Sequence, residues 1–249
     1  MSNNSNFYFV NGVGEKAKYT NAVFPILKKR SDGLFEGLGT GFFVNEGGLF
    51  FTAAHVIRAH DSSSEELYVV HLCHEEKTLI LRQVVSVISH KTTDFAFGIA
   101  KVPFNSETGE PIFNQKLTVT ESLPSKGESV INFGFPLSTP TRFDPSLDSQ
   151  CMLLEPFWSD GSVNEHYKDG RDTVIQPGNC IETSLESLPG ASGGPVMNED
   201  GLVFGLVSSG FDGSLTYVAP ICEVLDLKIM RDNDTGEILK FREVIDSRK

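Results

Sequence analysis

Short runs of apolar residues recur along the chain, and clusters of glycine, proline, asparagine, aspartate and serine separate them. The runs are rich in Val, Ile, Phe and Thr, which favour extended backbone, and turn-forming residues are typical of strand ends. The runs lie at residues 39–44, 48–57, 67–72, 78–88, 95–102, 129–135, 173–176, 201–208 and 215–220. This pattern predicts an all-β protein built from many short antiparallel strands.

Two other parts of the chain depart from this rhythm. Residues 136–172 are dense in turn formers, so we expect long loops there, and loops of that length are usually functional. Helical spacing of apolar residues is clear only near the C-terminus, at 221–230 and more weakly at 237–246. Because the turn-like segment 232–236 separates these stretches, we predict a terminal helix and a weaker second helical segment.

The strand pattern is interrupted at residues 103–125, where proline, glycine, serine and charged residues replace the apolar runs. A break of this kind is typical of the connection between two folding units. We therefore predict three parts, a first β unit at 1–110, a second at 111–220 and a helical tail at 221–249.

The composition is that of an ordinary globular protein, with 39% hydrophobic and 22% charged residues among 249. The net charge is −12 without a basic run, which disfavours a nucleic-acid partner. No apolar stretch is long enough to span a bilayer, and the N-terminus lacks the pattern of a secretory signal. We therefore expect a cytoplasmic protein without a nucleic-acid or membrane partner.

Cysteine and histidine spacing gives no metal pattern. The four cysteines, Cys73, Cys151, Cys180 and Cys222, lie far apart without a C-x-x-C pair, so we expect reduced thiols rather than disulfides. His71, Cys73 and His74 are close in sequence, but zinc sites need a second pair of ligands downstream. We expect no metal and no cofactor.

The most informative segment is the hexapeptide GASGGP at residues 190–195. Small residues around Ser192 let the backbone turn sharply and bring two N–H groups toward the position of a tetrahedral oxyanion. The alternative interpretation is a glycine-rich turn without chemical importance.

The order of residues restricts the class of hydrolase. The segment also fits the G-x-S-x-G pattern of α/β-hydrolases, which place the histidine after the serine, yet all six histidines precede Ser192. Gly193, Gly194 and Pro195 are also poor residues for the helix that those enzymes need there. The subtilisin order requires a helix-rich chain, so the order His, Asp, Ser remains.

Two residues fit that order. His55 lies among small alanines in TAAHV, which leaves room for its ring beside a carboxylate and a serine. Asp94 lies at the mouth of an apolar strand in TTDFAF, where burial of a carboxylate is costly unless a donor pairs with it. We predict His55 as general base, Asp94 as its orienting carboxylate and Ser192 as nucleophile.

The segments GTGFFV, TAAHVI, TTDFAFGIA, FGFPL, and LPGASGGPV followed by GLVFGLVSSG, together resemble the trypsin-like peptidase family, and most of all bacterial HtrA/Deg-type protease domains. The resemblance covers residues 35–220 in the right order. It implies two packed six-stranded antiparallel β-barrels of the chymotrypsin-like type, a catalytic triad between them, and peptide bonds as substrate. It also implies that Gly190 and Ser192 supply the N–H groups of an oxyanion hole.

The same resemblance implies a substrate that pairs as an added β-strand with residues 205–210. If Glu186 forms the floor of the specificity pocket, substrates with Lys or Arg would be favoured. If the loop turns Glu186 outward, Leu188 and Leu215 would shape an apolar pocket for small aliphatic residues, and both alternatives remain open. The predicted substrate-binding residues are Glu186, Ser187, Ser208, Ser209, Gly210 and Leu215.

The sequence therefore predicts a serine endopeptidase that acts through an acyl-enzyme. Two other functions remain, a silent peptide-binding module with the protease fold and a serine hydrolase of esters. Because little sequence follows Pro220, we expect no PDZ domain, and a regulatory protein partner or the ordering of loops is expected to control activity.

Overall fold

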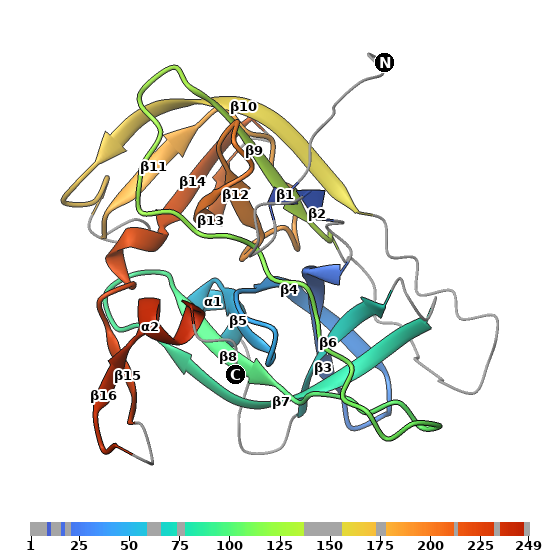
Figure 1. Cartoon of the computed structure of the whole chain (residues 1–249). Coiled ribbons are helices and arrows are strands. Elements are labelled where there is room, and N and C mark those ends of the chain that lie inside the picture. The colour runs from blue at the N-terminus through green and yellow to red at the C-terminus, as the bar shows by residue number, and fades with distance from the viewer. Residues whose placement is uncertain are drawn as a thin grey trace.

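The structure, a computed structural model, contains two closed β-barrels that follow one another along the chain (Figure 1). The first has the strand order β3-β4-β5-β8-β7-β6, and the second has the order β10-β11-β14-β13-β12-β9. All pairings within the barrels are antiparallel, which confirms the predicted fold class. The described residues are 9–10, 16–17, 21–58, 66–73, 78–136, 156–172, 178–211, 214–231 and 235–246.

The first barrel has a core rich in phenylalanine. Its strands are β3 (Val23–Lys29), β4 (Phe35–Phe43), β5 (Leu49–Thr52), β6 (Glu66–Cys73), β7 (Thr78–Ser89) and β8 (Ala96–Ala100). The rings of Phe24 and Phe43 lie 4.3 Å apart, and Phe51 meets Phe95 edge to face at 4.8 Å. These side chains are buried, and edge-to-face contacts between them stabilise the barrel beyond the area that they remove from water.

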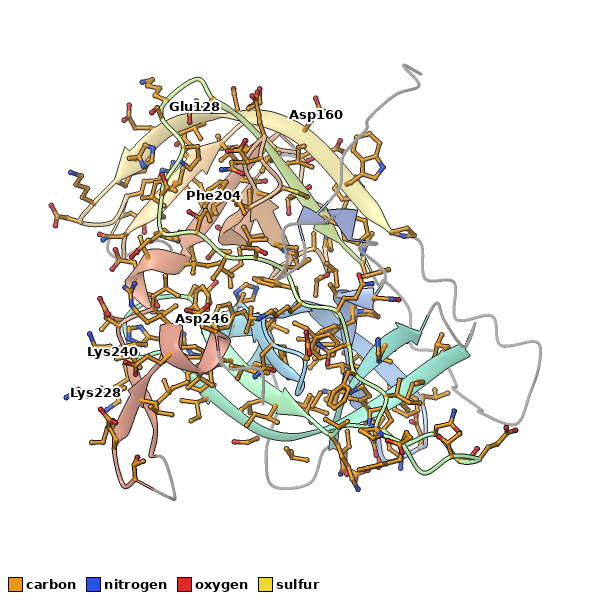
Figure 2. All side chains as sticks on the ribbon, viewed as in Figure 1. Glu128, Asp160, Phe204, Lys228, Lys240 and Asp246 are labelled. Atoms are coloured by element: carbon orange, nitrogen blue, oxygen red, sulfur yellow. The ribbon has the colours of Figure 1, made fainter. Side chains whose placement is uncertain are left out.

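The second barrel has a smaller, mostly aliphatic core. Its strands are β9 (Ser129–Gly134), β10 (Phe157–Tyr167), β11 (Cys180–Thr183), β12 (Pro195–Met197), β13 (Val203–Phe211) and β14 (Leu215–Pro220). Phe204 is fully buried inside this barrel, whereas Asp160 lies on its outer face (Figure 2). The core cluster consists of Val130, Val163, Ile181, Leu185, Val196, Phe204, Val207 and Val218.

The segment after β14 returns to the first barrel. It contains the 3-10 helix η2 (Ile221–Glu223), the hairpin of β15 (Lys228–Arg231) and β16 (Ile238–Lys240), and helix α2 (Phe241–Asp246). The ring of Phe241 lies 5.0 Å from that of Phe51 and 4.5 Å from that of Phe97. One hydrophobic cluster therefore joins the first barrel, part of the second barrel and the C-terminal segment.

The predicted helix at 221–230 is wrong. That stretch forms η2 and then β15, and among the described residues after β14 the only α-helix is α2. Alternate residues Leu227 and Ile229 pack against the core, so the apolar spacing that suggested a helix serves an extended chain here.

Two other predictions need correction, one of a strand and one of a loop. The run 48–57 ends as a strand at Thr52 and continues as helix α1 (Ala54–Arg58). Residues 157–167, expected in a loop, form β10, whose only fully buried residue is Val163. Because most of β10 is polar, the alternation that marks a strand is weak. The strand predicted at 173–176 lies outside the described residues.

Residues 101–128 connect the barrels and are held to the first one by a buried arginine. The guanidinium of Arg82 donates to the carbonyls of Ala100 and Lys101 and, at 2.8 Å, to Asn114 Oδ1. Burial lowers the pKa of Arg82 to about 10, so the group stays charged at neutral pH.

A two-stranded sheet of β1 (Phe9–Val10) and β2 (Lys16–Ala17) precedes the barrels. In the described part of the chain no helix is long and apolar enough to cross a membrane.

We predict that Phe241→Ala lowers the free energy of unfolding by about 3–5 kcal/mol, because it leaves a cavity among Phe51 and Phe97. The matched control is Phe113→Ala, since Phe113 is 59% exposed and its truncation should cost less than about 0.5 kcal/mol. Chemical denaturation of both variants measures the difference. Equal losses would mean that the C-terminal helix does not stabilise the first barrel.

Candidate active site

Asp94 collects hydrogen bonds from both barrels. His55 on α1 approaches it twice, with Nδ1 at 2.7 Å from Oδ2 and with its backbone N–H, which donates to Oδ1 at 2.9 Å. The hydroxyl of Ser208, on β13 of the second barrel, donates to Oδ2 at 2.6 Å. A buried carboxylate needs such donors, and here they come from elements that are far apart in sequence.

These bonds determine the proton position on the His55 ring. An ionised carboxylate can only accept hydrogen bonds, so Nδ1 carries a proton and donates it toward Asp94. In the neutral ring Nε2 is then the acceptor. The side chain of His55 is 47% exposed and that of Asp94 is 22% exposed, which leaves the ring accessible while the carboxylate is largely covered.

The pKa of Asp94 lies below its usual value. Burial acts to raise this pKa, but the hydrogen bond and charge of His55, the bond from Ser208 and the backbone bond from His55 together outweigh it. The carboxylate is therefore ionised at neutral pH. Its contribution to stability is present above the pKa of the unfolded chain and is lost as the pH falls through the lower pKa of the folded protein.

Ser192 lies in the tight loop before β12, and neighbouring glycines make this loop sterically feasible. Gly190 and Gly193 have φ values of +95° and +84°, where other residues are strained. A β-carbon at Gly193 would also collide with the carbonyl oxygen of Thr40, and one at Gly194 with the carbonyl oxygen of Phe133. The two glycines after the serine are thus needed because the backbone of both barrels closes on the loop.

Backbone contacts bring Ser192 toward the helix that carries His55. The N–H of Thr40 donates to the carbonyl of Ser192 at 2.8 Å. A β-carbon at Gly39 would lie 2.8 Å from that carbonyl and 2.6 Å from the side chain of Val56, which follows His55 on α1. Within the described residues, no hydrogen bond joins the Ser192 hydroxyl to the His55 ring.

The N–H groups of this loop fall into two sets. Those of Ala191, Gly193 and Gly194 donate to the carbonyls of Leu188, Val207 and Ala191 at 2.9, 2.7 and 2.9 Å. For the N–H groups of Gly190 and Ser192, the described part of the chain offers no acceptor. These two are the groups that the sequence assigns to an oxyanion hole.

The side chain of Glu186 points away from the interior. Glu186 is exposed, and its backbone carbonyl accepts from Asn132 Nδ2 at 3.1 Å and from the Ser159 hydroxyl at 2.8 Å. The residue that is buried next to this loop is Thr216. Its hydroxyl donates to the carbonyl of Leu185 at 2.8 Å.

The other predicted substrate residues lie together on the β13–β14 hairpin or beside it. Gly210 pairs with Thr216, and Phe211 pairs with Leu215. A β-carbon at Gly210 would lie 2.8 Å from Cβ of Ser187, so the hairpin and that loop approach each other too closely for a side chain at position 210. Ser209 is part of the same strand, and β12 pairs with β13 only as far as Leu206.

The weak metal pattern around His71 gains no support. His71 is buried, its Nδ1 has no hydrogen-bond partner among the described residues, and burial together with the charge of Arg82 lowers its pKa to about 4. His74 lies outside the described residues, and among those described no three metal-ligating side chains gather. Cys180 and Cys222 are free thiols.

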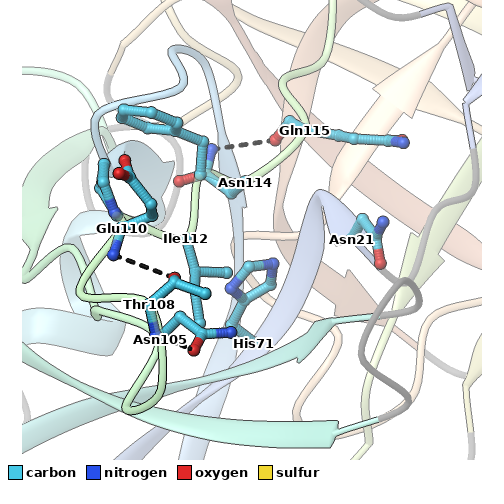
Figure 3. Close-up of a pocket in the computed structure, with 10 residues that line it drawn as sticks. Asn21, His71, Asn105, Thr108, Glu110, Ile112, Asn114 and Gln115 are labelled. Carbon is cyan, nitrogen blue, oxygen red and sulfur yellow. Dashed lines mark hydrogen bonds between the residues drawn. The ribbon is translucent and has the colours of Figure 1, made fainter.

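His71 instead lines a cavity of about 390 Å³ beneath residues 105–115 (Figure 3). Its other lining residues include Asn21 and Gln115, and none of them belongs to the group around Asp94. This cavity is therefore separate from the candidate active site.

The family model of the trypsin-like peptidase domain matches residues 39–206, which is more than half of the chain. The chain belongs to the trypsin-like peptidase family. The matched range contains His55, Asp94 and Ser192. The match supports a protease function in general terms. No curated protein matches the chain.

Solved structures of proteases share the fold of this family member. The crystal structure of Deg5 is similar over 83% of this chain and 87% of that chain, with a TM-score of 0.58 and 20% identity. The active form of the Rv3671c protease from M. tuberculosis is similar over 82% of this chain and 78% of that chain, with a TM-score of 0.54 and 18% identity. Its inactive form has a TM-score of 0.52 and 19% identity over 82% and 86% of the two chains.

The sequence did not predict two contacts of this site. The hydroxyl of Ser208, a predicted substrate-binding residue, donates to Asp94. Thr40, whose backbone binds Ser192, was not singled out at all. Neither role has a local signal, because each depends on contact between segments that are distant in the chain.

We predict that Ser208→Ala raises the pKa of Asp94, because it removes a hydrogen bond that lowers this pKa. The variant should also lose about 1–3 kcal/mol of stability at neutral pH, with a smaller difference at acidic pH where Asp94 is protonated. A carbon NMR titration of the Asp94 carboxyl measures the first effect, and denaturation across the pH range measures the second. Ser184→Ala is the control, since it also removes a serine hydroxyl, but one that accepts from the backbone N–H of Ser162 instead of donating to Asp94. An unchanged carboxyl titration in Ser208→Ala would contradict the assignment.

Proposed function

We propose that this trypsin-like peptidase family member is a serine endopeptidase with His55, Asp94 and Ser192 as its catalytic triad. Ser192 Oγ attacks the carbonyl carbon of the scissile peptide bond while His55 Nε2 accepts its proton. The tetrahedral intermediate collapses when the same proton passes to the leaving amine, and an acyl-enzyme remains. Water then attacks the ester, with His55 again as base, and releases the second product.

The observation that carries this proposal is the hydrogen-bond arrangement around Asp94. The carboxylate accepts from Nδ1 and from the backbone of His55, which sets both the tautomer and the orientation of the ring. The lowered pKa of Asp94 keeps it ionised, so it can stabilise the imidazolium that forms when the ring takes the serine proton. A histidine with no catalytic task would gain little from this arrangement at a half-exposed position.

The N–H groups of Gly190 and Ser192 form the oxyanion hole in this proposal. Among the described residues neither has an acceptor, whereas the flanking N–H groups of the loop do. Donors fixed in place before the reaction stabilise the charge on the tetrahedral intermediate without the cost of reorientation.

We propose that the substrate pairs as an added strand along Ser208, Ser209 and Gly210, and that its side chain before the scissile bond is small and aliphatic. The exposure of Glu186 supports this alternative over a basic preference, because its carboxylate faces solvent. The close approach of Ser187 to Gly210 favours a short side chain, and Leu215 adds an apolar surface.

The two other functions predict different results in one experiment with a fluorophosphonate probe, a peptide library and simple esters. A silent peptide-binding module would bind peptides without labelling of Ser192. An esterase would be labelled and would hydrolyse esters but not peptides. The endopeptidase should be labelled and should cleave both.

We predict that Ser192→Ala abolishes labelling and lowers peptide cleavage by at least about 10⁴-fold, because no nucleophile remains. The melting temperature should change by no more than a few degrees, since Ser192 lies in a loop and is only partly buried. Peptide cleavage by the variant at the rate of the parent would refute the proposed function.

We predict that Asp94→Asn lowers kcat by about 10⁴-fold, the size known for the same change in trypsin, because the amide favours the wrong tautomer of His55. Steady-state kinetics at neutral pH measure this effect. A loss of less than tenfold would mean that another group orients the ring.

We predict that the parent prefers Val or Ala over Lys or Arg before the scissile bond, and that Glu186→Gln changes this profile by less than about twofold. The reason is that a solvent-facing carboxylate contributes little to the binding of a charged side chain. Mass spectrometry of cleaved peptides gives both profiles. A basic preference that Glu186→Gln removes would instead place the carboxylate at the pocket floor.

A further inference from the structure

Thr40 on β4 has hydrogen bonds at each of its polar groups. It is fully buried, and its N–H donates to the carbonyl of Ser192 at 2.8 Å. Its carbonyl accepts from the hydroxyl of Thr52 at 2.7 Å. Its own hydroxyl donates to the carbonyl of Gly190 at 2.8 Å and accepts from the N–H of Phe135 at 2.9 Å. Two of these bonds go to Gly190 and Ser192, which lie in the loop before β12. Packing in a barrel core alone would not require them.

The direction of the Thr40 hydroxyl bond is determined by its partners. The N–H of Phe135 can only donate, so the oxygen of Thr40 must accept there. The carbonyl of Gly190 can only accept, so the single proton of the hydroxyl points to it. Thr40 therefore holds Gly190 from one side while the end of β9 in the second barrel holds Thr40 from the other.

Both residues of the proposed oxyanion hole are anchored at their carbonyls by this one threonine. The side-chain hydroxyl holds Gly190, and the backbone N–H holds Ser192. The Gly190 carbonyl belongs to the peptide unit shared with Ala191, whereas the Gly190 N–H belongs to the unit shared with Pro189. The bond from Thr40 therefore fixes one side of the Gly190 α-carbon, about which a glycine at φ +95° could otherwise rotate with little steric hindrance. The Ala191 N–H, bound to Leu188, fixes the same peptide unit at its other end.

Packing around the hydroxyl leaves little room for the loop to relax. A β-carbon at Gly134 would lie 3.3 Å from the Thr40 hydroxyl and 3.0 Å from the α-carbon of Ala191. The loop that carries Ser192, the end of β9 and β4 are therefore in close contact at this point. A shift of one of these segments would displace the other two.

We propose that Thr40 is the positioning residue of the oxyanion hole, and that its hydroxyl keeps the Gly190 N–H directed at the developing oxyanion. The inference rests on the proposed function for its catalytic consequence. Its structural content, that the hydroxyl of Thr40 sets the orientation of Gly190, holds independently of turnover.

The test compares Thr40→Val, which replaces the hydroxyl by a methyl group of similar size, with Thr40→Ser, which keeps the hydroxyl. Thr183→Val is the matched control, because Thr183 is also a fully buried threonine whose hydroxyl donates to a backbone carbonyl. Thr40→Cys is a fourth variant with a weak donor, for use if the valine variant does not fold. Circular dichroism and thermal unfolding establish the folded fraction of each protein, and rates are expressed per folded molecule.

We expect Thr40→Val to lower kcat by about 10- to 100-fold with KM within about threefold of the parent, since complete loss of one oxyanion donor costs about 10²- to 10³-fold. Thr40→Ser should retain kcat within about threefold, and Thr40→Cys should fall between serine and valine. Thr183→Val should lose thermal stability but keep kcat within about threefold. A purely structural role would instead give equal effects in Thr40→Val and Thr183→Val.

Amide NMR of protein labelled with ¹⁵N-glycine separates this inference from the proposed function. The Gly190 resonance should shift or broaden in Thr40→Val and remain in place in Thr40→Ser, whether or not peptides are cleaved. An inactive parent that shows this change would refute the endopeptidase and leave the positioning role standing. An unchanged Gly190 resonance together with an unchanged kcat in Thr40→Val, or in Thr40→Cys if that variant is used, would overturn the positioning role.

Discussion

A carboxylate that is largely withdrawn from water organises this molecule. Asp94 would be costly to bury alone, and its cost is offset by donors from α1 and from β13 of the other barrel. Because His55 and Ser208 must both reach the same carboxylate, the two barrels can pack in only a narrow range of orientations. The same bonds set the tautomer of His55, so the interaction that helps to join the barrels also orients the ring of the proposed general base.

The second constraint is the lack of space around Ser192. Gly193 and Gly194 have no room for a β-carbon, since carbonyl oxygens of Thr40 and Phe133 occupy that volume. This closeness is what allows one buried threonine to hold both Gly190 and Ser192. The loop that carries Ser192 is thus supported by backbone groups of both barrels, and support from rigid elements holds a site more precisely.

The fold could be predicted wherever apolar and polar residues alternate or where an apolar run is bounded by turns, as in β6, β7 and β14. It could not be predicted for β3, which contains Pro25, or for β10, whose outer face is polar. Hydrogen bonds to neighbouring strands make these segments extended, and one neighbour of each, β6 for β3 and β9 for β10, is distant in sequence. The C-terminal stretch was misjudged for a related reason, because spacing alone does not distinguish a short helix from a hairpin that packs one face on a core.

The sequence by itself determined the residue types and their order along the chain, and from these it predicts which residues carry the chemistry of a peptidase. The order of His55, Asp94 and Ser192 and the glycines around the serine excluded other hydrolase classes, because residue type and chain order need no coordinates. Tertiary structure decided what those residues touch. The bond from Ser208 to Asp94, the outward direction of Glu186 and the contacts of Thr40 join or separate segments far apart in the chain, and only the packing of two barrels determines such distances.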